Sequence, residues 1–440
     1  NSESLTRSFS TPTSADVWSF STWVKRGNPA STGVVGLFFA TYNRDGLYWN
    51  SGTNLRTLQN GATDVLNYGQ YLEDVSQWWH IMWTQNGTTA IGYINGVQVV
   101  TATATNDSIN ESGITHYIGN RATSAAPYDG YIAETVFIDG QALAASSFGQ
   151  TDTSTNRWIP RDVSGLTFGN NGFYLNYAAS GDVGNDVSGN NNDFTNNNAV
   201  VQSTDSPTTN YATIDSWGYF GGASALSEGN LRISGSAATV TCNRLSTLGL
   251  SSGKWIIASR PNSQAGYNCG TYVANEAGVA SNTTAIWSDT SGNYIGIDGL
   301  AVNQFRSQVG AGATLVVPSP DFEAGVDYLL VALDADNNKV YRGWYDVSAD
   351  NTYWLNDTAW TGNPVTGVGG VLISGNEFKF VFTSYTGRSG LIDFGQGTFL
   401  SNVTIPTGYS VVAQDNMTSS DQLISAFSWI KNRDATDNHM

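Results

Sequence analysis

The sequence predicts an all-β protein with two antiparallel β-sandwiches in tandem and a short C-terminal extension. Apolar and polar residues alternate at the two-residue period of a strand, as in Trp18–Lys25. Asn-Gly and Asp-Gly pairs separate such runs and supply the positive-φ residues of tight turns. With 440 residues the chain is too long for one ordinary core, so we expect two domains.

Composition narrows the classes of function. Charged residues make up 12% of the chain, well below the roughly 25% of a typical soluble domain, and the formal net charge is −17. Because phosphate backbones and anionic lipids attract basic surfaces, we expect neither nucleic acid nor a membrane as a partner. The longest apolar runs have only the length of strands, so membrane insertion is not expected.

The first sandwich is expected over residues 1–198. Its centre is the stretch Trp78–Val99, which predicts three strands joined by turns at Asn86-Gly87 and Asn95-Gly96. We expect most of its tryptophans in the core, and a short helix at Ala142–Phe148. Further strands are expected at Val34–Thr41, Leu47–Trp49, His116–Gly119, Tyr131–Ile138 and Gly172–Tyr177.

A connector is expected over residues 199–225, where Pro207 holds its neighbour in an extended form. The second sandwich is expected over residues 226–416, and residues 417–440 form the extension. The predicted strands of the second sandwich include Tyr328–Asp334, Lys339–Tyr345, Glu377–Phe382 and Gly390–Phe394.

Ordered motifs in the first sandwich resemble those of the concanavalin A-like lectins, in the laminin-G and pentraxin-like branch. They are the Trp-x-His start and Asn-Gly turns of Trp78–Val97, the I-G-N-R of Ile118–Arg121 and the Y-D-G-Y-I-A-E-T-V-F-I-D-G of Tyr128–Gly140. This resemblance implies a jelly-roll sandwich.

The second sandwich is similar to SPRY-like domains. The similar motifs are G-K-W at Gly253–Trp255, V-A-L-D-A-D-N-N-K-V-Y at Val331–Tyr341 and D-F-G-Q-G-T-F at Asp393–Phe399. The usual G-K-W-Y-W-E run of that family is G-K-W-I-I-A here. The resemblance implies a second β-sandwich used for recognition.

Three other segments resemble modules in structural proteins of marine tailed bacteriophages. They are Phe137–Asp152, Asn171–Tyr177 and Asp186–Thr195, and Phe427–His439 resembles the opening of a further module. Because that last segment has no partner strands in the chain, we expect the natural protein to continue or the segment to pair with another chain.

The resemblance implies a non-enzymatic protein on the virion surface of a tailed phage, outside the cell. We expect a tail fibre, spike or capsid appendage that binds host-surface polysaccharide, forms a homo-oligomer and contacts other virion subunits. The first alternative is a purely architectural decoration or fibre module that binds neighbouring subunits. The second is an extracellular glycan hydrolase, since the lectin fold family includes glucanases.

Glycan binding requires aromatic rings beside polar groups, because a ring face packs on sugar C–H groups while amides and carboxylates orient the hydroxyls. Residues in predicted loops or near strand ends are the candidates. They are Tyr48, Trp49, Tyr128, Asp129, Trp287, Trp354 and Trp360.

Laminin-G and pentraxin relatives often bind calcium, so the resemblance makes calcium the cofactor to consider. Asp182, Asp186 and Asp193 offer carboxylate oxygens close together in the sequence, so they are the candidate ligands. Asx-rich turns are the alternative explanation of the same residues. The run that starts at Asp334 resembles an EF-hand loop but lacks its glycine and its final glutamate, so we interpret it as a turn.

Catalytic and cysteine chemistry have little support in the sequence. Glu134 and Asp139 lie five residues apart on a predicted strand, so their side chains are expected on opposite faces and not as a glycosidase pair. The two cysteines, Cys242 and Cys269, have no second pair for a zinc site. The sequence leaves open whether they form a disulfide or are two buried thiols.

Overall fold

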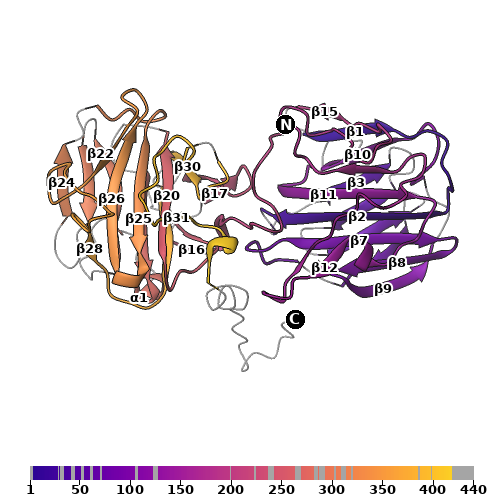
Figure 1. The fold of residues 1–440 in the computed structure, drawn as a ribbon, viewed down its shortest axis with the longest axis horizontal. Coiled ribbons are helices and arrows are strands. Elements are labelled where there is room, and N and C mark those ends of the chain that lie inside the picture. The colour runs from indigo at the N-terminus through magenta and orange to yellow at the C-terminus, as the bar shows by residue number, and fades with distance from the viewer. Residues whose placement is uncertain are drawn as a thin grey trace. The chain divides into compact units, whose positions relative to one another are not determined.

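The computed structural model describes residues 3–27, 29, 34–40, 45–50, 54–59, 63–69, 72–104, 108–121, 127–198, 200–221, 224–235, 242–262, 269–281, 286, 293–301, 304–308, 314–318, 321–384, 387–397 and 399–418. The chain divides into two compact units, Asn1–Trp217 with Leu226–Arg232, and Gly218–Ala225 with Ile233–Met440. Both units are built from sheets whose strands pair antiparallel except for the short parallel pair of β20 (Lys254–Pro261) and β31 (Ser410–Val411), which confirms the all-β prediction (Figure 1). In these parts of the chain no helix is long and apolar enough to cross a membrane.

The first unit is a sandwich of two large sheets with a small hairpin. One sheet has the order β15 (Thr195–Asn197), β1 (Ser4–Ser8), β10 (Thr115–Ile118), β3 (Val34–Ala40), β4 (Gly46–Asn50), β5 (Asn54–Gln59), β6 (Thr63–Asn67). The other has the order β14 (Phe173–Leu175), β11 (Gly130–Asp139), β2 (Val17–Arg26), β7 (Trp79–Asn86), β8 (Thr89–Ile94), β9 (Val97–Thr103). The hairpin pairs β12 (Gly149–Thr151) with β13 (Trp158–Pro160).

The stretch at the centre of the sequence forms three consecutive strands, as expected. Strands β7, β8 and β9 pair in chain order and lie next to β2 in one sheet (Figure 1). Asn95 and Gly96 connect β8 to β9 with φ values of 47° and 81°. Two positive φ values are what a type I′ hairpin turn requires, so the Asn-Gly pair fixes the register of this hairpin.

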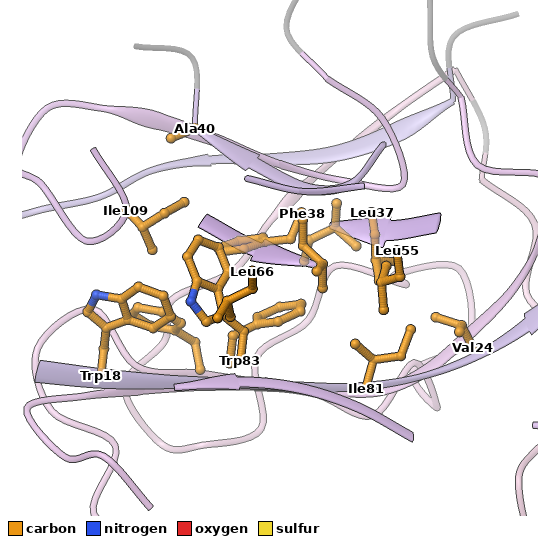
Figure 2. Close-up of a cluster of buried hydrophobic side chains, with 14 of the residues drawn as sticks. Trp18, Val24, Leu37, Phe38, Ala40, Leu55, Leu66, Ile81, Trp83 and Ile109 are labelled. Atoms are coloured by element: carbon orange, nitrogen blue, oxygen red, sulfur yellow. The ribbon is translucent and has the colours of Figure 1, made fainter. Parts of the chain in front are cut away.

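The core of the first unit lies between its two sheets. Trp18 and Trp83 project from one sheet, and Phe38 and Leu55 project toward them from the other (Figure 2). All four side chains are fully buried, and the two indoles meet edge to face at 4.7 Å. Aromatic pairs of this geometry add to the free energy of simple area burial, so these tryptophans stabilise the fold and are not recognition residues.

The outer face of the six-stranded sheet is also covered. The indole Nε1 of Trp158 donates to His80 Nδ1 at 3.1 Å, and His80 Nε2 lies 2.8 Å from Ser21 Oγ. His80 is fully buried, and burial lowers its pKa to about 3, so its ring is neutral. The predicted helix in this covering segment is a single 3-10 turn, η1 (Ala145–Ser147).

Part of the segment predicted as a connector packs within the first unit. The side chain of Lys25 on β2 reaches Asp205, Asn210 and the backbone of Tyr211. The division between the two units falls inside β16 (Ile214–Gly221), later in the chain than the expected end of the first sandwich.

The second unit has two large sheets. One has the order β16, β19 (Cys242–Ser246), β29 (Phe378–Ser384), β21 (Cys269–Asn275), β22 (Tyr294–Ala301), β23 (Gln304–Gln308), β24 (Thr314–Pro318). The other has the order β17 (Ser224–Ser227), β18 (Arg232–Gly235), β30 (Ser389–Asp393), β20 (Lys254–Pro261), β25 (Tyr328–Asp334), β26 (Lys339–Asp346), β27 (Asn351–Trp354), with β28 (Val371–Leu372) beside β26 and β31 (Ser410–Val411) beside β20. The helical elements are α1 (Glu276–Ser281), η3 (Ala335–Asn337) and η4 (Gln414–Asn416). The segment Phe427–His439 lies outside the described residues.

Strand register answers the question of the two cysteines. Cys242 on β19 and Cys269 on β21 are both paired with Ser384 on β29, one from each side. Two strand spacings of about 4.8 Å separate them, and the Cα atoms of a disulfide must lie within about 7 Å of each other. Neither cysteine forms a disulfide.

Candidate functional site

Three of the aromatic residues predicted to bind glycan are buried, and those predictions are wrong. Trp49 is 0% exposed, Tyr48 7% and Trp354 9%. Trp49 lies on β4 with its ring turned into the core of the first unit, whereas Trp354 packs in a cluster on the nine-stranded sheet of the second unit. A sugar cannot reach a ring face that protein atoms already cover.

Trp360 stays a candidate on its exposure alone, because its side chain is half-buried. Its ring packs edge to face against Phe305 at 5.9 Å and Trp344 at 6.2 Å, and its Nε1 donates to the carbonyl of Pro318 at 2.9 Å. The described contacts of Trp360 include no carboxylate or amide side chain. Trp287 lies outside the described residues.

Asp186, predicted as a calcium ligand, is instead the acceptor that holds a loop. Its Oδ1 accepts the backbone N–H groups of Tyr174 and Ser188 at 2.8 and 2.9 Å, and its Oδ2 accepts from the backbone of Asn192 at 2.8 Å. Asp193 Oδ1 in turn accepts the N–H of Asp186 at 2.8 Å. These lone pairs are occupied by protein donors, as in Asx turns.

Asp182 does not join the other two carboxylates. Its Oδ1 accepts the N–H of Gly184 at 3.3 Å in a turn of its own. Within the described part of the chain, no three His, Cys, Asp or Glu side chains gather as a metal site would require. Asp182, Asp186 and Asp193 each accept at least one backbone N–H as turn residues do, and calcium binding by them stays a prediction.

The remaining two glycan candidates lie together at one end of the first sandwich, where β2 ends and β11 begins. Tyr128 is half-buried, stacks on Trp49 at 5.6 Å and donates its hydroxyl to the carbonyl of Lys25 at 2.9 Å. The guanidinium of Arg26 lies over the same Trp49 ring, 5.0 Å from its centroid. Tyr128 is thus fixed in position, and the next residue, Asp129, is exposed.

The carboxyl group of Asp129 lies at the surface but is partly shielded from water. The surrounding protein raises its pKa by desolvation, while a hydrogen bond from the backbone N–H of Gly229 works in the opposite direction. Gly229 belongs to the turn 228–230, which is far from Asp129 in the sequence but within the same unit.

That same turn brings a residue that the sequence did not indicate, Asn230. Its side chain is completely buried, and its Nδ2 donates to the carbonyls of Gly27 and Ile214 and to Ser216 Oγ at 2.6, 3.0 and 2.9 Å. Three acceptors around one nitrogen fix the orientation of the amide. Asn230 Oδ1 therefore points the other way, and this oxygen has no hydrogen-bond partner among the residues that the structure describes.

Two acceptor oxygens converge beside Gly27. A Cβ on this glycine would stand 2.9 Å from Asp129 Oδ1 and 3.3 Å from Asn230 Oδ1. A Cβ at this distance from Asp129 Oδ1 is closer than proteins allow, so this close approach requires glycine at position 27. Of the two oxygens, only that of Asp129 belongs to an exposed residue and can accept a hydrogen bond from a ligand, because Asn230 is fully buried.

The two carboxylates weighed for catalysis are used separately. Glu134, at a bulge of β11 with φ 50°, accepts the hydroxyl of Tyr174, and burial raises the pKa of its carboxyl group. Asp139 is buried at the end of the same strand and accepts hydrogen bonds from Thr13 and Asn110. Within the described part of the chain the two side chains share no hydrogen-bond partner, so this geometry does not combine them as acid and nucleophile.

Comparison with known proteins gives one family. Residues 4–147 match the concanavalin A-like lectin/glucanases superfamily, which identifies the first sandwich as lectin-like in fold. The matched range includes Gly27, Tyr128 and Asp129 but ends before Asn230. A comparison with curated proteins gives no match.

Solved structures with similar folds have low scores. The SPRY domain of human HERC1 is 11% identical with a TM-score of 0.29, covering 40% of this chain and 96% of that one. A putative carbohydrate binding protein from Bacteroides ovatus is 12% identical with a TM-score of 0.34, covering 46% of this chain and 58% of that one. Domain 4 of an extracellular arabinanase from Geobacillus stearothermophilus, in complex with arabinotriose, is 23% identical with a TM-score of 0.28, covering 33% and 71%. These similarities are too low to carry an argument about function.

Proposed function

We propose that the chain is a non-enzymatic glycan-binding protein whose first sandwich takes a sugar beside Asp129. The observation that carries the proposal is the exposed carboxylate of Asp129 next in the chain to the half-buried ring of Tyr128, which a hydrogen bond to Lys25 holds in place. A sugar hydroxyl can donate to this carboxylate, and hydrogen bonds to a charged oxygen are the stronger ones. Tyr128 supplies an apolar ring for the C–H groups of the sugar.

We further propose that this sugar belongs to a host-surface polysaccharide and that the protein is a surface component of a tailed-phage virion. The phage-like motifs at Phe137–Asp152 and Asp186–Thr195 support this proposal. In such an appendage the protein is extracellular, forms a homo-oligomer and contacts other virion subunits. Repetition around the appendage raises the avidity of weak single sites without any new contact.

The test is glycan binding by the full chain and by two matched variants. Asp129→Asn removes the charge but keeps the size of the side chain. Loss of a charge-assisted hydrogen bond costs about 1.5–3 kcal/mol, so affinity for array-selected oligosaccharides falls about 10- to 100-fold. Asp182→Asn is the control, since this exposed carboxylate also accepts one backbone N–H in the same unit.

A second pair of variants tests the geometry without removing a polar group. Gly27→Ala places a methyl group 2.9 Å from Asp129 Oδ1 and so displaces the carboxylate that is proposed to receive the sugar. Gly165→Ala is its control, because no atom lies within 4 Å of the added Cβ. Glycan binding that survives both Asp129→Asn and Gly27→Ala, or an array without any bound glycan even for the multimerised protein, contradicts the proposal.

The pH dependence of binding gives an independent check. The site binds donors best when Asp129 is ionised, and the pKa of this carboxyl group is raised by desolvation. Affinity is therefore full well above that raised pKa and declines as the pH falls through it. The decline begins at a higher pH than for an ordinary aspartate, and Asp129→Asn abolishes it.

An architectural role is the second candidate, and one observation favours it. Strand β9 is the edge of the six-stranded sheet, and its sequence V-Q-V-V-T-A-T has neither a charge nor a proline. Edges of this kind pair readily with another chain, although a bulge against β8 bends this one. Light scattering of Thr101→Lys tests it: the architectural role requires the variant to dissociate to a smaller species than the parent chain.

A further inference from the structure

A buried lysine in the first unit faces a carboxylate and a carboxamide. Lys25 on β2 is completely buried, and its Nζ lies 2.9 Å from Asp205 Oδ2 and 3.0 Å from Asn210 Oδ1. The third donor direction is taken by the backbone carbonyl of Tyr211. Both Asp205 and Asn210 are themselves buried, so this group of polar atoms is closed off from water.

The surroundings of the amine are aromatic. The ring of Tyr131 lies 5.8 Å from Lys25 Nζ, and Trp78 packs beside that tyrosine at 6.2 Å. Trp78 Nε1 also donates to Asp205 Oδ1 at 3.2 Å. Burial in this shell lowers the pKa of Lys25, although Asp205 opposes the shift. A buried ammonium gives up its proton more easily than an exposed one, which leaves a nucleophilic amine.

The carboxamide presents its carbonyl end to that amine. Asn210 Nδ2 donates to the carbonyl of Ser76 at 2.9 Å, so its nitrogen points away from Lys25 and its carbonyl end faces Nζ. Asp205 stands against the same Nζ, where it can accept a proton. Nucleophile, electrophile and base are thus in hydrogen-bond contact before any reaction, which is the arrangement that makes an intramolecular step fast.

We propose that Lys25 and Asn210 become joined by an intramolecular isopeptide bond, with Asp205 as the proton-transfer group. Lys25 Nζ, as the free amine, attacks Asn210 Cγ and forms the new C–N bond. Asp205 accepts the proton that Nζ loses and delivers it to Nδ2. The Cγ–Nδ2 bond then breaks and ammonia leaves. The step involves no oxidation or reduction and requires no co-reactant, since an amine and a primary amide give a secondary amide and ammonia.

The bond would join β2 to the segment that the sequence predicts as a connector. Lys25 and Asn210 are 185 residues apart, so the cross-link closes most of the first unit into a covalent ring. A link of this kind restricts the unfolded chain as a disulfide does, but reductants do not break it. It also replaces the ammonium, which is costly to bury, with a neutral amide.

Peptide mapping of the full, unfolded chain tests the proposal. After trypsin digestion, Ser8–Arg26 and Asp162–Arg232 should appear as one branched species, lighter than the two peptides together by one ammonia, about 17 Da. Cleavage after Lys25 should be absent. The Lys254–Asp334 ion pair is an internal control: its 2.9 Å contact is half-exposed at the lysine, and Lys254 should remain unlinked.

Two variants identify the partners. Asn210→Ala keeps the Lys25–Asp205 ion pair, and its peptides should be separate with masses equal to their sequences. Lys25→Met should behave in the same way. Separate peptides from the parent chain overturn the proposal. A branched species that has lost water, about 18 Da, places the bond on Asp205 and overturns the assignment to Asn210. Because the parent chain alone gives a decisive result, a variant that fails to fold does not affect the test.

Discussion

Removing the carboxylate of Asp139 should selectively destabilise the first unit. This side chain is 2% exposed at the end of β11. It accepts the backbone N–H groups of Thr13, Ser14 and Asn171 at 2.7, 3.1 and 3.0 Å, and Asn110 Nδ2 at 2.7 Å. One carboxylate therefore ties three separate loops to the strand.

The structure sets the size of the effect. Asp139→Ala leaves four donors without their acceptor, and each buried unsatisfied donor costs about 1–3 kcal/mol before water or local rearrangement relieves it. We expect a loss of about 4 kcal/mol in the free energy of unfolding, which is larger than most single substitutions cause. Asp139→Asn keeps one acceptor oxygen but turns an N–H₂ toward the other donors, so about half of that loss should remain.

Urea unfolding of the full chain with hydrogen exchange measured by mass spectrometry is the suitable assay, because two units need not unfold together. Asp393→Ala is the matched control. Asp393 is a buried carboxylate at the end of β30 that accepts four backbone N–H groups, from Gly395, Gly397, Phe399 and Leu400. Each variant should lose protection in its own unit. A cost below about 1 kcal/mol for Asp139→Ala would refute the reasoning.

Three further predictions concern buried groups. His80 and His116 are neutral in the folded protein because burial lowers their pKa values from 6.5 to about 3. The free energy of unfolding therefore decreases as the pH falls below about 6.5, by up to about 2.7 kcal/mol per pH unit for the two rings. Urea unfolding at a series of pH values should show this slope halved in His116→Phe, and an unchanged slope contradicts the prediction. Gly149→Ala puts a Cβ 2.4 Å from Trp158 Cε2 and should cost about 1–3 kcal/mol in the same assay, whereas Gly165→Ala should change stability by less than about 0.5 kcal/mol. Both cysteine thiols should react with Ellman's reagent in the unfolded chain without prior reduction, and a value of zero would show a disulfide.

Local sequence patterns predicted the strands well where the pattern itself determines the structure. The stretch Trp78–Val99 became three strands with an Asn-Gly hairpin turn, and Tyr328–Asp334 is a strand with the expected bounds. Alternation and turn chemistry act over a few residues, so they are visible in the sequence. A short helix was expected at Ala142–Phe148, but only a 3-10 turn forms there, and its apolar residues pack in a core cluster.

The candidate site was only partly visible in the sequence. Tyr128 and Asp129 were found through their position in a predicted loop, but Trp49 alternates with Tyr48 on a strand and its burial depends on which sheet covers it. Asn230 had no signal, because it reaches Gly27 through a turn about 200 positions later. Long-range contacts of this kind depend on how sheets stack, which no local pattern encodes.

The three predicted calcium ligands show a second limit of sequence-based prediction, which concerns the direction of side chains. Asp182, Asp186 and Asp193 have the composition of a cation site, but each of them accepts a backbone N–H from a neighbouring residue of the loop. Asx residues serve as turn acceptors more often than as ligands, and only the direction of each carboxylate distinguishes the two uses. The sequence supplies the oxygens but not their directions.

The most direct test of the central claim is a crystal structure of the full chain with the oligosaccharide that binds best on the array. We predict a sugar hydroxyl within hydrogen-bond distance of the Asp129 carboxylate, and the ring of the sugar next to Tyr128. An oligosaccharide bound elsewhere, with the Asp129 carboxylate in contact with water only, would contradict the account.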